Sequence, residues 1–140
     1  MEFEWGYLFA AHCPASGEAF ALLLPDCDSA MMRLFLEGLS AQIGPERHAV
    51  LCMDKAAWHR DAVLEGFENL SALRLPPYSP ELNPAEQPWK QMRQNHLNNR
   101  VFESLDALFD AVCIAWNTLT QEAIKQLCGY PWILKLCSKS

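Results

Sequence analysis

The chain has 140 residues, of which 51% are hydrophobic and 20% are charged. This length and composition predict a single folded domain, residues 1–140, and exclude a disordered protein. No apolar stretch is long enough to cross a bilayer and the start lacks a basic signal-peptide region, so we expect a cytoplasmic protein with no membrane partner. The net charge of −6 argues against nucleic-acid binding through overall charge.

The negative charge lies in the first part of the chain. Residues 1–54 contain two basic and eight acidic side chains, whereas residues 55–140 contain nine of each. The segment Gln87–Val101 contains three basic residues, Lys90, Arg93 and Arg100, and no acid. It predicts either a locally positive surface or an ordinary solvated helix face.

Six cysteines are spread along the chain, and none is closer than nine positions to the next. In a chain without a C-x-x-C pair or an export signal, this spacing favours reduced, mostly buried thiols over disulfides. A zinc site built from scattered cysteines and the four histidines is the less favoured alternative.

The first third of the chain predicts a hairpin followed by a helix. Alternating large aromatic residues indicate a strand over Glu4–His12, and Glu18–Leu24 is the second strand of the hairpin. A helix then begins at Asp28 or Ser29 and ends near Gly44. Its methionine-rich stripe predicts core packing rather than a cofactor contact.

The remaining elements predict an α/β domain with a mixed sheet flanked by helices. His48–Met53 is a continuous apolar run, typical of a strand buried on both faces. A helix over Ala56–Phe67 and a short strand over Leu70–Leu75 follow. The later helices are expected over 85–97, from Ser104 to Trp116, and over 120–127, with a break at Gly129–Pro131.

Four prolines lie within nine residues, at positions 76, 77, 80 and 84. They fix φ and remove backbone donors, so this segment predicts a rigid loop. Asn83 is expected to cap the following helix, with Pro84 at its first position and Glu86 in its first turn.

Two carboxylates occupy positions suited to metal chemistry. Asp54 follows a predicted buried strand, and sites in open α/β sheets gather at the carboxyl ends of strands. Glu86 begins a helix after the rigid loop. Carboxylate oxygens suit Mg²⁺ or Mn²⁺, and two such ions about 3.5–4 Å apart can cleave and transfer phosphodiesters. The residues alone leave a second interpretation open, in which Asp54 only ends a strand and Glu86 only favours the helix dipole.

The motifs Met53–His59 and Leu75–Glu86 together resemble the catalytic domain of bacterial insertion-sequence transposases of the mariner-type DDE superfamily. The proline-rich motif is highly specific. The resemblance extends through four further segments, residues 5–9, 13–18, 93–97 and 115–117.

The resemblance implies an RNase H-like fold and metal-dependent DNA cleavage and strand transfer at transposon ends. In this family an Asp, an Asp and a Glu hold two divalent cations, Mg²⁺ or Mn²⁺. By motif, Asp54 is similar to the second acid and Glu86 to the third, with His59 and Asn83 as supporting residues. Lys90, Arg93 and Arg100 become candidates for contact with DNA.

The chain departs from the family in two ways. Lys55 stands beside Asp54, where the family usually has a small or amide residue. The family's first aspartate and the first central strand that carries it are absent, so we expect a partial domain that is inactive alone. It would act on DNA together with the upstream part of the transposase. The alternative is a non-catalytic interaction module that pairs with that part or forms a homo-oligomer.

Overall fold

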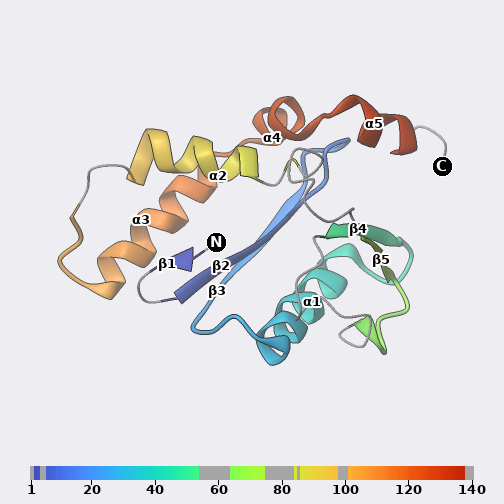
Figure 1. Cartoon of the computed structure of the whole chain (residues 1–140), viewed down its shortest axis with the longest axis horizontal. Coiled ribbons are helices and arrows are strands. Elements are labelled where there is room, and N and C mark those ends of the chain that lie inside the picture. Colours follow the sequence, from blue (N-terminus) through green and yellow to red (C-terminus); the bar gives the residue numbers. More distant parts are fainter. Residues whose placement is uncertain are drawn as a thin grey trace. The chain divides into compact units, whose positions relative to one another are not determined.

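The computed structural model describes residues 2–3, 6–53, 64–74, 84, 86–97 and 101–137 (Figure 1). The chain forms two compact units. The first is Met1–Phe9 with Phe20–Asn83, and the second is Ala10–Ala19 with Pro84–Ser140. Strands and helices both occur among the described residues, so the predicted α/β class is confirmed.

The N-terminal strands confirm the predicted hairpin. β2 (Gly6–His12) pairs with β3 (Ala19–Leu24) in a sheet of the order β1-β2-β3. The short strand β1 (Glu2–Phe3) was not predicted, and it runs antiparallel to β2 with Glu2 opposite Tyr7. β1 therefore covers the beginning of β2 along one edge.

Helix α1 (Ser29–Ile43) has the predicted boundaries. It begins where the Asp28 carboxylate accepts a hydrogen bond from the backbone N–H of Met31, with Oδ1 and N 2.9 Å apart. It ends at Gly44, whose φ of 83° lies in the left-handed region that favours glycine.

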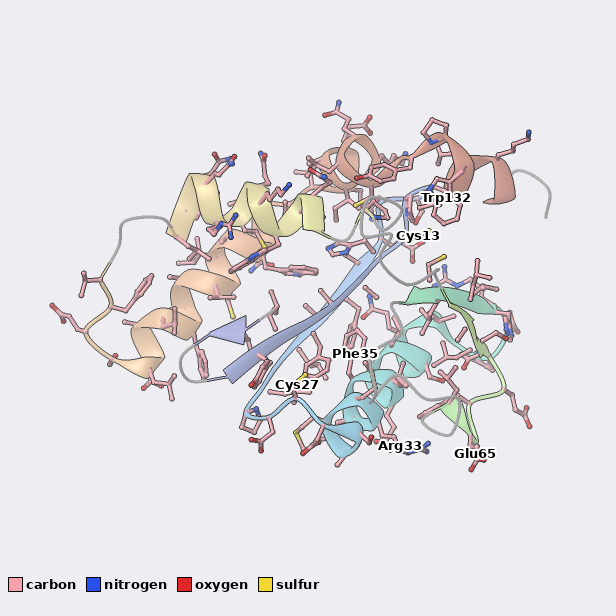
Figure 2. The ribbon with its side chains drawn as sticks, viewed as in Figure 1. Cys13, Cys27, Arg33, Phe35, Glu65 and Trp132 are labelled. Carbon is pink, nitrogen blue, oxygen red and sulfur yellow. The ribbon has the colours of Figure 1, made fainter. Side chains whose placement is uncertain are left out.

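The buried face of α1 forms the core of the first unit. The Phe35 ring lies 5.9 Å from the ring of Phe9 in β2 and 5.6 Å from that of Phe20 in β3 (Figure 2). Gly38 admits the Phe20 ring, since a Cβ at this position would approach that ring to 2.6 Å. Seven apolar side chains are buried here: Leu8, Phe9, Met32, Phe35, Leu36, Leu39 and Leu70.

Strands β4 (Ala49–Met53) and β5 (Leu70–Arg74) form a parallel pair, in register from Ala49 opposite Leu70. Among the described residues this pair is a sheet of its own, so the predicted single mixed sheet is not confirmed. A two-stranded sheet leaves a face open. The Val50 side chain is accordingly 61% exposed, and β4 is not buried on both faces as predicted.

The helix predicted over Ala56–Phe67 does not reach its expected end. Residues 54–63 lie outside the described residues, and residues 65–66 form a turn. Gly66 has a φ of 88°, which is incompatible with a continuing right-handed helix. The backbone N–H of Phe67 instead donates to the carbonyl of Leu64, with N and O 3.1 Å apart.

Asn69 joins this turn to the end of α1. Its Nδ2 donates to the carbonyl oxygens of Ser40 and Gly44, at 3.0 and 2.9 Å, and its Oδ1 accepts from the Ser40 hydroxyl at 2.6 Å. Both carbonyls lie at the end of α1, where the Ser40 carbonyl also accepts from the backbone N–H of Gly44 at 3.0 Å. A single side chain therefore caps α1 and positions the start of β5.

The second unit is built mainly from helices. α2 (Glu86–Met92) continues into a π-helix, η3 (Arg93–Leu97), in agreement with the predicted helix over 85–97. α3 (Leu105–Asn117) and α4 (Gln121–Cys128) begin at the expected positions. α5 (Pro131–Cys137) was not predicted. We interpreted Pro131 as a helix breaker, but proline is also favoured at a first helical position.

Helix α2 contacts α3 and α4, and η3 contacts α3. The buried residues of this unit are Pro88 and seven hydrophobic residues, Met92, Ala111, Val112, Ala115, Ile124, Cys128 and, in α5, Ile133. The hairpin tip also packs in this unit. Gly17, with a φ of 79°, is buried so closely against the start of α4 that a Cβ would overlap the Gln121 backbone.

The cysteines only partly match expectation. The five cysteines whose side chains the structure describes are reduced, as predicted. Of these five, Cys13 and Cys113 are exposed and only Cys128 is buried. Burial raises the pKa of the Cys128 thiol to about 11. Within the described helices, none combines the length and apolar character needed to span a bilayer.

Candidate active site

The position of Asp54 follows from strand β4. Met53 is the last residue of β4, and Asp54 comes immediately after it, outside the described residues. Because β4 and β5 are parallel, their carboxyl ends lie at one edge of the sheet. Asp54 therefore directly follows the carboxyl end of a strand, which is the position that the sequence analysis predicted for it.

Glu86 is the first residue of α2, although its side chain is outside the described part of the chain. The start of this helix is held by Pro84, which is buried. The Pro84 carbonyl accepts from the backbone N–H of Gln87 at 3.0 Å and from the Cys128 thiol at 3.8 Å. Glu86 is thus attached to a backbone that is tied to α4. Asp54 belongs to the first unit and Glu86 to the second.

Three further predicted site residues, His59, Asn83 and Arg100, lie outside the described residues. Lys90 and Arg93 are described, and both side chains are exposed. The Arg93 guanidinium carbon lies 5.9 Å from the centroid of the Trp89 ring. This arrangement is a cation–π pair near the long end of its usual range.

Two side-chain hydrogen bonds attach the α2–η3 segment to its neighbours. The His96 Nε2 lies 3.2 Å from the Thr118 hydroxyl at the end of α3. Gln87 Nε2 donates to the Tyr130 hydroxyl between α4 and α5, also at 3.2 Å. Both ends of the segment are therefore fixed, and the exposed side chains between them are carried on an anchored backbone.

Sequence reasoning missed His12, which lies at the end of β2. Its Nε2 is buried and has no hydrogen-bond partner among the described residues, and its ring lies 5.4 Å from that of Trp116. Desolvation by burial lowers the pKa of His12 from 6.5 to about 4. No local pattern could have revealed this, because Trp116 is remote in sequence.

The described residues contain no group of three or more His, Cys, Asp or Glu side chains that could hold a metal ion. This finding gives no support, within that part of the chain, to the zinc alternative. The predicted donors, Asp54 and Glu86, are both carboxylates, and oxygen donors fit Mg²⁺ or Mn²⁺ in kind. Two carboxylates are fewer than the three acids that the resemblance implies.

These observations define an α/β protein with one candidate acid after a parallel strand and another at the start of a helix. The sequence pattern of the DDE superfamily endonuclease family matches residues 3–109, and the chain belongs to that family. It is 40% identical over 121 residues to the uncharacterized protein y4pE/y4sA of Sinorhizobium fredii (strain NBRC 101917 / NGR234). That alignment covers 86% of this chain and 90% of the relative. No solved structure matches the chain.

Membership of this family carries an expectation about function. Domains of this family act on DNA and generally use divalent metals, so the family implies a transposase-like nuclease function. The match includes residues of both compact units, since it runs from β1 into α3.

Proposed function

We propose that this chain is part of the RNase H-like catalytic domain of a DNA transposase, working in the cytoplasm on transposon ends. The observation that carries the proposal is the family match over residues 3–109. The position of Asp54 directly after β4 and of Glu86 at the start of α2 supports it, because sites in α/β proteins gather at the carboxyl ends of strands and at the helix starts that follow them.

Asp54 and Glu86 would hold Mg²⁺ or Mn²⁺. When bound, the metal supplies Lewis-acid activation of the attacking oxygen and stabilisation of the leaving oxygen during phosphodiester cleavage and transfer. His59 and Asn83 would support these acids from the segments next to them in sequence. Lys90, Arg93 and Arg100 would contact phosphate oxygens, since cationic side chains fix the register of a protein on DNA.

We further propose that residues 1–140 are inactive alone. The family uses three acids, and only Asp54 and Glu86 match its motifs in this sequence. An upstream polypeptide that carries a strand with an aspartate would complete the site. The coding sequence before Met1 is the first place to look for it.

The test is a DNA nicking assay with Mg²⁺ or Mn²⁺ on a plasmid that carries the flanking transposon ends. Residues 1–140 alone should give no metal-dependent nicks, and adding the upstream segment should give nicking and joining. Asp54→Asn or Glu86→Gln should then reduce both products to background. Glu81→Gln serves as the matched control, because Glu81 belongs to the same proline-rich sequence motif, Leu75–Glu86, but does not match a metal ligand of the family.

Two results would contradict this proposal. Nicking by residues 1–140 alone that Asp54→Asn abolishes would refute the inactivity. Nicking by the completed protein that survives both Asp54→Asn and Glu86→Gln would refute the roles of these acids.

A second candidate function is a non-catalytic interaction module, and the β4–β5 sheet favours it. Val50 is 61% exposed and Leu73 is 41% exposed. In the parallel register they share a face, because Val50 pairs with Ser71, two residues from Leu73. Such apolar exposure is typical of a surface that another chain covers.

Light scattering tests the second function. Self-association should appear as oligomers that Val50→Thr with Leu73→Thr converts to monomers. Val101→Thr is the matched control, since Val101 is 96% exposed in the second unit. A monomer at all concentrations, with no binding to the upstream polypeptide, would exclude the interaction module.

A further inference from the structure

We propose that the exposed face of α2 and η3 binds an unpaired stretch of DNA, with Arg93 and Trp89 forming a stacking surface for a base. The inference rests on the proposed function only for the choice of DNA as the partner. It concerns binding and requires neither metal nor cleavage.

The geometry of the two side chains supports a stacking role. Trp89 and Arg93 are four residues apart and meet at 5.9 Å, with the ring half-buried and the guanidinium exposed. Within the described part of the chain, no hydrogen bond or ion pair engages this guanidinium. Its planar face is therefore available, and unpaired bases stack on such planes as well as on aromatic rings.

The surroundings of the pair are polar and cationic. Lys90 is exposed one residue after Trp89. The one acid of α2 is its first residue, Glu86, seven residues and about 10 Å of helix before Arg93, and no acid follows it as far as Val101. The exposed neighbours are amides: Gln91, Gln94 and Asn95. None of the exposed large hydrophobic side chains of the described residues lies in α2 or η3. A polar, cationic surface with an aromatic ring fits nucleic acid better than an apolar protein partner.

Acidic groups on the neighbouring helices do not cancel this charge. α3 touches η3 through Thr118, whereas its acids Asp106 and Asp110 lie at least eight residues earlier. That separation is about 12 Å or more along the helix axis, which exceeds the screening length of about 8 Å in physiological salt. The first turns of α3 also lie farther from α2 than its last turn does (Figure 1). α4 carries one acid and one base, Glu122 and Lys125.

The π-helix contributes to the same surface. η3 presents three consecutive exposed side chains, Arg93, Gln94 and Asn95, while His96 and Leu97 are half-buried. The wide turn is held at its end by the contact of His96 with Thr118. π-Helical turns are rare and often occur at functional sites.

The stacking surface distinguishes unpaired DNA from duplex DNA. Phosphate contacts by Lys90 and Arg93 would serve both forms. Bases in a duplex already stack on one another, so only an unpaired base can lie on the guanidinium of Arg93. The planar guanidinium of Arg93 should therefore contribute to the affinity for single strands and not to the affinity for duplexes.

The experiment measures fluorescence anisotropy of a labelled thymidine oligonucleotide and of a duplex of equal length. It uses residues 1–140 at low salt with EDTA, so cleavage plays no part. Arg93→Lys keeps the charge and removes the plane, and should weaken single-strand binding roughly three- to tenfold while changing duplex binding less than about twofold. Trp89→Leu should cause a similar loss, and Trp89→Phe should retain most of the affinity.

Salt dependence separates charge from stacking. Arg93→Gln should reduce the slope of log K against log salt for the single strand by about 0.7, whereas Arg93→Lys should leave it unchanged. Arg47→Lys is the matched control, because Arg47 is an exposed arginine of the first unit. It should alter neither affinity nor slope.

Three results would overturn the inference: no single-strand binding by the unmodified chain, unchanged single-strand binding by Arg93→Lys, or an equal loss for both DNA forms. Circular dichroism confirms that each variant is folded. The binding assay contains no metal, so a negative result in it contradicts only the stacking surface. The proposed cleavage depends on Asp54 and Glu86 and is tested by the nicking assay.

Discussion

Each of the two units contains an arginine over an aromatic ring, and the two pairs differ in what else holds the guanidinium. In the first unit, Arg33 lies 4.8 Å from the Phe67 ring and its Nη1 donates to the Glu65 carbonyl at 3.0 Å (Figure 2). In the second unit, Arg93 is exposed and lies 5.9 Å from the Trp89 ring. The first arginine is used to hold a turn against α1, and the second is available to a ligand.

The units also differ in how they treat buried polar atoms. The part-buried Asn69 amide of the first unit makes three side-chain hydrogen bonds to Ser40 and Gly44. Among the described residues, the two buried side-chain nitrogens without a hydrogen-bond partner, His12 Nε2 and Trp132 Nε1, belong to the second unit. Unmet hydrogen bonds cost stability, so the second unit depends more on its tight apolar contacts.

The largest expected effect tests those contacts. Gly17→Ala should lower the free energy of unfolding by about 3 kcal/mol, since it combines a left-handed φ with overlap of the Gln121 backbone. Gly66→Ala in the first unit has the same sign of φ and no atom within 4 Å of the added Cβ, so about 1–2 kcal/mol is expected. Urea denaturation followed by circular dichroism measures both. Equal losses would show that the hairpin tip does not pack on α4 as described.

The next effect tests the hydrogen bonds of the first unit. Asn69→Ala should cost about 2–3 kcal/mol, because it leaves the carbonyls of Ser40 and Gly44 without their side-chain donor. Ser40→Ala removes only the hydroxyl contact and should cost about 1 kcal/mol. If the two variants proved equally stable in urea denaturation, Asn69 would not be the clamp between α1 and β5.

The third effect is a pH dependence located in the second unit. Burial holds the pKa of His12 at about 4 in the folded chain, against 6.5 when unfolded. Between pH 4 and pH 6.5 the unfolded state binds more protons at His12 than the folded state does. The contribution of neutral His12 to the free energy of unfolding is therefore complete above pH 6.5 and decreases toward pH 4. The expected loss is about 1.4 kcal/mol per pH unit at most.

His12→Leu should flatten this dependence when unfolding is measured between pH 4 and 7. His48→Gln is the control, because His48 is an exposed histidine of the first unit bonded to Ser71. The slope should persist in that variant. A slope that remains in His12→Leu would assign the titration to another group.

The accuracy of the sequence predictions follows the range of the interactions involved. Helix starts at Asp28, Ser104 and Thr120 were predicted correctly, because each cap bonds a backbone N–H three residues away. The exposure of Val50 and the close approach of Gly17 to α4 were not predicted. They depend on which distant segments pack against a strand or turn.

The candidate site shows the same division. The sequence places Asp54 after a strand and Glu86 at a helix start, and β4 and α2 have those boundaries. The stacking of Arg93 on Trp89 also lies within one helical turn, and four-residue spacing could have indicated it. The environment of His12 could not be predicted, because its aromatic neighbour comes from α3.

The smallest expected effect returns to the two arginines. Arg33→Lys should destabilise the chain by about 1 kcal/mol, since lysine cannot both cover the Phe67 ring and reach the Glu65 carbonyl in the same geometry. Arg93→Lys should change stability by less than about 0.5 kcal/mol, because its side chain is exposed. Thermal denaturation of the two variants measures the difference. A larger loss for Arg93→Lys would mean that this arginine holds the fold, and its guanidinium would then be unavailable to DNA.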